Sequence, residues 1–290
     1  MAGNPHFASV VLQLHCNGDF EDSSSAKRTV TGHHTVGFVQ SGALFGKSLS
    51  LNGSNQYASV SHAPSLSLNG QNRYTIDVAI RTSQSGRVQT ILTKRSSANE
   101  YALVINTDGH VQFVAWGSGG QLLISVASTT TVSLNAWHRI RIGLNQGACY
   151  LFLDGVKEDE TLFTGAIEGT ETDLFIGRDP TRVDRHFAGL LDELRLTEGV
   201  CITTDDYSLD SAPFPDIGVI TLRGNATTSA GMAVDLVRIF EWPAGKMVAA
   251  EQPSITGDWG SAQPPGVYGI TYIATDCQPV THGPYTVEQP

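Results

Sequence analysis

The carboxylate of Asp192 calls for a chemical explanation because of where it lies. It belongs to a segment, Phe187 to Gly199, in which apolar and polar residues alternate as they do in a strand. On that pattern Asp192 faces inward together with Leu190, Leu194 and Leu196. A buried carboxylate is costly unless backbone N–H donors, a metal ion or a similar partner compensates it. The sequence therefore predicts a long core strand that carries one inward acid, and it leaves both compensations open.

A second group of side chains, in the segment RDPTRVDRH, could bind a polar ligand. Its members are Arg178, Arg182, Asp184, Arg185 and His186. Guanidinium groups donate forked hydrogen bonds to hydroxyls or carboxylates. Trp116 ends a predicted strand next to the glycine-rich GSGGQ, and an exposed aromatic there could stack on a sugar ring. The alternative for the arginine-rich segment is an ordinary charged loop.

Other residues are weaker candidates for binding or catalytic groups. Trp137 is expected in the core or as a lid on it, and His33-His34 is too isolated to form a metal site. Acids that could hydrolyse a glycosidic bond occur at 158–160 (EDE) and at Asp192-Glu193. In a strand, however, consecutive side chains face opposite sides. Since no GxSxG, HExxH or P-loop pattern is present either, the sequence predicts a protein that is not an enzyme.

The elements that must position these residues are strands. Alternating runs recur at a spacing of about 8 to 12 residues and are separated by turn residues such as Asn52-Gly53, read as a hairpin signal. The best candidate for a short helix is TTDDYSLD at 203–210. Composition changes near SAPFPD, where Pro213 and Pro215 flank Phe214. The sequence thus predicts an all-β protein with a large sandwich at 1–214 and a small β-sandwich at 217–290.

Charge and composition narrow the classes of partner. The 290 residues carry a formal net charge of −10, which argues against nucleic acid and anionic membrane surfaces as partners. There is no signal-peptide pattern and no apolar run long enough to insert into a membrane. The four cysteines are scattered, and we expect them to be reduced.

The order of several motifs resembles one known family. The motifs are LHCNG, FEDSS, SLSLNGSNQYASV, YTIDVAIR, LNAWHRIRI, YLFLDG, LFIGRD, FAGLLDELRLTEGV and APFPD. Together they resemble the laminin-G-like, concanavalin-A-like jelly rolls, in the variant common in bacteriophage tail and other virion proteins. The resemblance covers residues 8 to 216. Residues 217–290 resemble more loosely the carboxypeptidase-regulatory or transthyretin-like sandwich, an Ig-like β-sandwich that often follows such domains.

The resemblance implies a metal site and a function. Family members often bind Ca²⁺ at one edge, and by position the ligands here would be Asn17, Asp22 and Asp192. Asn17 stands where the family usually has aspartate, so it supplies one negative charge less.

The implied function is a non-enzymatic virion protein of a phage tail or spike, assembled in the host cytoplasm, that binds a host surface glycan or receptor. We expect it to contact other virion proteins and to form a homo-oligomer. Two alternatives stay open: a purely structural or decoration component of the virion, and a cellular carbohydrate-binding module.

Overall fold

Antiparallel β-sheets make up almost all regular structure in the computed structural model, as the sequence predicts. The structure describes residues 4–96, 98–216, 220–225, 227, 234–241, 247–254, 258–263, 266–274 and 279–287. Contacts divide the chain into a larger unit, Ser9–Phe214, and a second unit made of Pro215–Pro290 together with Met1–Ala8. Within the described residues, no helix has the length and apolar character needed to cross a membrane.

The larger unit contains one sheet of eight strands. Their order is β13-β12-β11-β6-β15-β4-β3, and β1 also pairs with β15. The strands are β1 (Val10–Leu14), β3 (Gly37–Val39), β4 (Ser48–Asn52), β6 (Arg73–Thr82), β11 (His138–Asn145), β12 (Ala148–Leu153), β13 (Val156–Leu162) and β15 (Ala188–Glu198).

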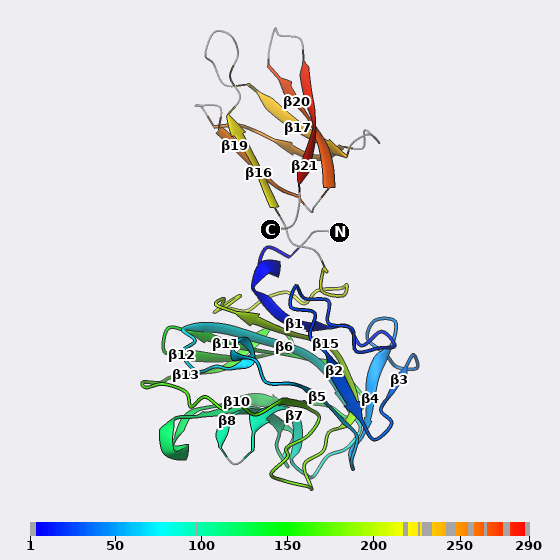
Figure 1. The fold of residues 1–290 in the computed structure, drawn as a ribbon, viewed down its shortest axis with the longest axis vertical. Coiled ribbons are helices and arrows are strands. Elements are labelled where there is room, and N and C mark those ends of the chain that lie inside the picture. Colours follow the sequence, from blue (N-terminus) through cyan, green and yellow to red (C-terminus); the bar gives the residue numbers. More distant parts are fainter. Residues whose placement is uncertain are drawn as a thin grey trace. The chain divides into compact units, whose positions relative to one another are not determined.

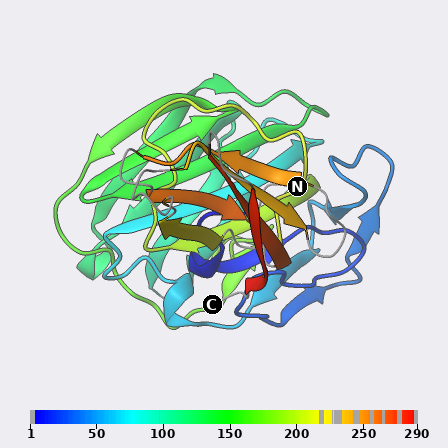
Figure 2. The same ribbon diagram turned by 90° about the horizontal axis from the view of Figure 1, so that it is seen from above.

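A second sheet of seven strands lies against the first (Figure 1). Its order is β10-β9-β8-β7-β14-β5-β2. β2 ends this sheet and β3 ends the first sheet, and both blue strands lie near one edge of the larger unit when it is seen from above (Figure 2). The strands are β2 (Val30–His33), β5 (Tyr57–Val60), β7 (Gln89–Arg95), β8 (Asn99–Ile105), β9 (His110–Trp116), β10 (Leu122–Thr131) and β14 (Leu174–Ile176). Three short 3-10 helices accompany the sheets: η1 (Phe7–Ser9), η2 (Pro64–Leu66) and η3 (Ser118–Gly120).

One apolar core fills the space between the two sheets, and β6 shows how the sequence produces it. Tyr74, Ile76, Val78 and Ile80 alternate along β6 and all belong to this core. Their spacing of two residues puts them on one face of the strand. On the opposite face, Asp77 is paired with Arg141 and Arg195 at 2.6 and 2.9 Å.

Strand β15 spans nearly the predicted segment, but its alternation is broken. Leu191, Leu194 and Leu196 are in the core, whereas Leu190 is not. The pairing with β6 shifts register between Asp192 and Arg195, and Glu193 has a φ of +46°. Such a bulge inserts one extra residue into the strand, so the side chains after it point to the opposite faces from those that strict alternation predicts. Asp192 is fully buried, as predicted, and it pairs with Ala79, a neighbour of the core residues Val78 and Ile80 on β6.

Two local predictions are also wrong. The turn at Asn52-Gly53 does not close a hairpin, because β4 and β5 belong to different sheets. The turn therefore carries the chain from one layer to the other. The segment 203–210, the helix candidate, contains no helix.

The second unit also consists of antiparallel strands. β16 (Ile220–Asn225) pairs with β19 (Asp258–Gln263), and the other four strands are ordered β18-β17-β20-β21. Those four are β17 (Leu236–Glu241), β18 (Met247–Glu251), β20 (Gly266–Ile273) and β21 (Val280–Val287). Val237, Ile239, Trp259 and Ile270 belong to its core.

Candidate functional site

The arginine-rich loop 178–186 connects β14 of the seven-stranded sheet to β15 of the eight-stranded sheet. Main-chain hydrogen bonds hold both of its ends: Phe187 N–H donates to the Gly177 carbonyl (3.0 Å), and Thr90 N–H donates to the Arg185 carbonyl (2.8 Å). Inside the loop, Asp179 accepts hydrogen bonds from the Thr181 N–H and hydroxyl groups. The loop thus has a defined conformation at the surface.

The predicted loop residues differ in exposure. Arg182 and Asp184 are exposed, Arg178 and Arg185 are half-buried, and His186 is 7% exposed. None of the three arginine side chains makes an ion pair or a hydrogen bond with another described residue. Val183, between them, is 84% exposed. The loop therefore presents guanidinium donors and one apolar side chain to the solvent.

Arg95 of β7 joins this loop to Trp116, a link that the sequence analysis missed. Its guanidinium NH1 lies 3.2 Å from Asp179 Oδ2, and its Cζ lies 5.1 Å from the Trp116 ring centroid. Trp116 is half-buried at the end of β9, and its cross-strand neighbour is Leu122, which is 52% exposed. Two features that the sequence singled out separately thus belong to one surface. A lone arginine in a strand gives no signal of such a role.

Further basic and aromatic residues lie next to Arg178. Its guanidinium lies over Tyr57 of β5, 4.4 Å from the ring centroid. His33 of β2 stacks on the same ring at 4.2 Å, and the His34 and His186 rings are 6.1 and 6.4 Å away. The sequence analysis set His33-His34 aside as isolated. Only the pairing of β2 with β5 brings both histidines to Tyr57.

Of the residues expected to bind Ca²⁺, Asn17 and Asp192 are both bound by the segment 45–48, whereas Asp22 is bound by other residues. Asp22 accepts hydrogen bonds from the N–H groups of Gln13, Ser24 and Arg28 and from the Ser24 hydroxyl. Asp192 accepts from the Ser48 hydroxyl at 2.7 Å and from main-chain N–H groups. Asn17 accepts from the Lys47 N–H.

Asp22 shares no hydrogen-bond partner with Asn17 or Asp192. Within the described part of the chain, no three His, Cys, Asp or Glu side chains are grouped to hold a metal. Burial raises the pKa of Asp192 to about 6, although the Ser48 hydrogen bond partly offsets this. Ca²⁺ binding stays a prediction that a titration tests.

The acids considered for glycoside hydrolysis bind neighbouring strands or residues. Glu158 accepts hydrogen bonds from Thr129 and Thr130 of β10, and Asp159 accepts from the Ala127 N–H. They thereby tie β13 and β10, the end strands of the two sheets, to each other. Glu193 is 1% exposed and is bound by His15 and by the Phe214 N–H. No facing pair of accessible carboxylates results from these contacts.

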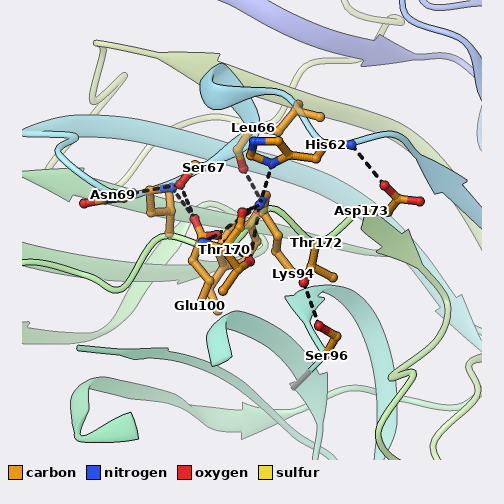
Figure 3. Close-up of polar contacts among 12 residues, drawn as sticks. His62, Leu66, Ser67, Asn69, Lys94, Ser96, Glu100, Thr170, Thr172 and Asp173 are labelled. Carbon is orange, nitrogen blue, oxygen red and sulfur yellow. Dashed lines mark hydrogen bonds and ion pairs between the residues drawn. The ribbon is translucent and has the colours of Figure 1, made fainter. Parts of the chain in front are cut away.

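A buried polar cluster is centred on Lys94, the residue before Arg95, and connects several segments of the larger unit (Figure 3). Lys94 and Glu100 are fully buried, and Lys94 Nζ is 3.1 Å from Glu100 Oε2. Lys94 also contacts His62 Nδ1 and donates to the Thr170 carbonyl, and Glu100 accepts from Ser67, Leu68 and Thr170. The ion pair therefore fixes the segments on both sides of it, and it leaves no free acid or base for chemistry.

A separate cleft of about 320 Å³ lies in the larger unit. It is lined by Leu68, Gly70, Gln71, Asn72, Gly147, Phe163, Gly165, Ala166 and Ile167. None of these residues belongs to the arginine-rich loop, so the cleft is a second possible location for a ligand.

Comparisons with known proteins agree on the fold. A family model described as the concanavalin A-like lectin/glucanases superfamily matches residues 52–203. No curated protein matches the chain.

Several solved structures are similar to this chain. Domain 4 of AbnA, an extracellular arabinanase from Geobacillus stearothermophilus in complex with arabinotriose, has 18% identity and a TM-score of 0.52, over 67% of this chain and 94% of that one. The binding domain of Paraclostridial Mosquitocidal Protein 1 has 15% identity and a TM-score of 0.58, over 92% and 76%.

A third structure is entitled "Cell entry of botulinum neurotoxin type C is dependent upon interaction with two ganglioside molecules". It has 12% identity and a TM-score of 0.52, over 71% of this chain and 50% of that one, so the present chain spans half of it. At these identities the likeness concerns the fold.

Proposed function

Because the chain belongs to the concanavalin A-like lectin/glucanases superfamily, we propose that its larger unit is a non-catalytic domain that binds a surface glycan. The observation that carries the proposal is the surface formed by the loop 178–186, Arg95 and Trp116. It combines the guanidinium groups of the loop arginines, which make no ion pair with described residues, with the aromatic ring of Trp116, and these are the groups that bind hydroxyls and sugar faces. The ligands in the titles of similar structures, arabinotriose and ganglioside, are consistent with this.

A non-catalytic role is supported by the hydrogen bonding of the acids. Hydrolysis of a glycosidic bond needs two carboxylates about 5 to 9.5 Å apart, on either side of the bond. Glu158, Asp159 and Glu193 are instead bound to other parts of the same unit. A surface that binds without cleaving fits these contacts.

We also propose that the chain is a component of a phage virion, in the tail or on a spike, and that the glycan or receptor belongs to the host surface. The support is the order of the sequence motifs, up to SLDSAPFPD at 208–216. Detection of the chain by mass spectrometry in purified virions tests the location. Its absence from virions would favour a cellular carbohydrate-binding module.

A glycan array probed with the full chain tests glycan binding. We expect binding that Arg182→Ala/Arg185→Ala weakens by about tenfold or more, since each charged hydrogen bond contributes about 1.5–3 kcal/mol. The matched control is Lys27→Ala/Lys157→Ala, which removes two cations elsewhere on the larger unit. A chain that binds no glycan, yet is present in virions, would indicate the structural or decoration role instead.

A further inference from the structure

The residues around Tyr57 form a cationic cluster from separate parts of the sequence. We call His33, His34, Tyr57, Arg178 and His186 the Tyr57 cluster. Its cationic or protonatable groups come from β2, from the residue after β2, from the loop after β14 and from the residues before β15. All four lie within 6.4 Å of the Tyr57 ring centroid. Such a gathering is unexpected in a chain with a net charge of −10.

Arg178 is held in place, yet its donors are unused. The rings of Tyr57 and Phe175 lie 4.4 and 6.0 Å from its Cζ, so the guanidinium has little conformational freedom to lose on binding. Within the described part of the chain, its side chain makes no hydrogen bond and no ion pair. A half-buried guanidinium in this state offers a preformed, forked donor to an anion.

Two of the neighbouring histidines have lowered pKa values, so they add to the attraction of an anion only once they are protonated. Burial, His34 and Arg178 lower the pKa of His33, against the opposite effect of Asp173. Burial also lowers the pKa of His186; its hydrogen bond with the Val183 carbonyl opposes this, while Arg178, Arg87 and His34 add to it. Asp173 is engaged by the His62 N–H, and Asp184 makes no ion pair with the cluster. No carboxylate of the described protein therefore neutralises the cluster by direct contact.

We infer that the Tyr57 cluster binds the carboxylate of an acidic sugar, and that Arg178 is its main contact. The inference rests on the proposed glycan binding and names the class of sugar. The exposure of the two side chains assigns the contact to Arg178. Tyr57, at 9% exposure, is too covered to stack on a sugar ring, whereas Arg178, which lies over it, is only half-buried. The cluster would therefore bind the carboxylate of the sugar through the Arg178 guanidinium.

Two matched pairs of ligands test this inference by calorimetry. The pairs are methyl β-D-glucuronide with methyl β-D-glucoside, and the methyl glycoside of N-acetylneuraminic acid with its methyl ester. Within each pair the carboxylate is the main difference. We expect the acid of at least one pair to bind about tenfold or more tightly than its neutral partner. Arg178→Gln should abolish this preference.

Arg139→Gln is the matched control, because Arg139 also lies over an aromatic ring, Phe45 at 5.3 Å, but belongs to β11 of the other sheet. It should keep the preference. Far-UV circular dichroism checks that both variants are folded. Arg178→Lys, which keeps the charge and loses the fork, should retain part of the preference.

The affinity for the acid should also rise by several-fold from pH 7.5 to pH 5.5. A bound anion raises the pKa of the neighbouring histidines, so binding takes up protons. The neutral partner should show no such dependence.

Equal affinities within both pairs, or a preference that Arg178→Gln leaves intact, would overturn the inference while leaving glycan binding standing. Binding of neither member of either pair would also overturn it, and the glycan array would then decide the proposed function separately.

Discussion

Removing the buried cation Lys94 should destabilise the larger unit strongly. In Lys94→Met, the Glu100 carboxylate stays at 0% exposure but loses the ammonium group 3.1 Å away. The Thr170 carbonyl loses its Lys94 donor and His62 loses its contact with Nζ. The remaining donors of Ser67, Leu68 and Thr170 are uncharged and compensate the carboxylate only in part.

The size of the effect follows from this burial. Breaking a buried ion pair by removing one partner costs about 3–5 kcal/mol, because the other charge is left uncompensated. For a unit of this size, about 1 kcal/mol changes the melting temperature by about 2–4 °C. We therefore expect Lys94→Met to lower the melting temperature of the larger unit by about 6–20 °C.

Differential scanning calorimetry of the full chain measures this change. The matched control is Lys157→Met, which breaks a lysine–glutamate pair of 2.7 Å whose side chains are 33% and 55% exposed. The control should change stability by less than about 1 kcal/mol. The double variant Lys94→Met/Glu100→Gln should lose less stability than Lys94→Met, because no unpaired charge remains. Equal losses in Lys94→Met and Lys157→Met would refute the reasoning.

Three further predictions concern the same unit. Because the folded pKa of Asp192 is about 6 and exceeds the unfolded value, its ionisation opposes folding. Urea unfolding should show that stability relative to Asp192→Asn falls by up to about 2–3 kcal/mol as pH rises from about 4 to about 6; a flat difference would contradict the assigned burial. If Asn17, Asp22 and Asp192 bind Ca²⁺, as expected from the sequence, millimolar Ca²⁺ added to chelator-treated protein should raise the melting temperature, and Asp192→Asn should abolish the rise; an unchanged melting temperature of the parent protein would contradict the calcium site. A fragment 9–214 should melt as the full chain's larger unit does, whereas a fragment 9–211 should be less stable, since it lacks the Phe214 N–H that donates to Glu193 and the ring beneath Arg195; equal stability would show that Phe214 is dispensable.

Much of the fold could be predicted from alternation and turn residues. The alternation of β6 is visible in the sequence, as are the turn residues Asp108-Gly109 between β8 and β9 and Gln146-Gly147 between β11 and β12. The strand β13 was not predicted, because its EDE run shows no alternation of apolar and polar residues. The faces of β15 were wrong because a bulge at Glu193 depends on pairing with β6, and a single sequence carries no mark of it.

The site was predictable only in part, for a related reason. The loop 178–186 and Trp116 stand out by composition; residues 181–184 of the loop are exposed, whereas Trp116 is half-buried and His186 is buried. Arg95, His33 and Tyr57 become candidates only when β7, β2 and β5 are placed in one sheet. When the partners of a residue are distant in the sequence, no short sequence pattern around that residue indicates its role.

The indole N–H signals in an NMR titration with a glycan identified on the array test the binding surface most directly. We predict that the Trp116 signal shifts, together with amide signals of the loop 178–186. The Trp137 signal should stay in place, because its indole N–H already donates to the Gly42 carbonyl. Shifts at Gln71, Asn72 and Phe163 around the separate cleft, with Trp116 unchanged, would contradict the account.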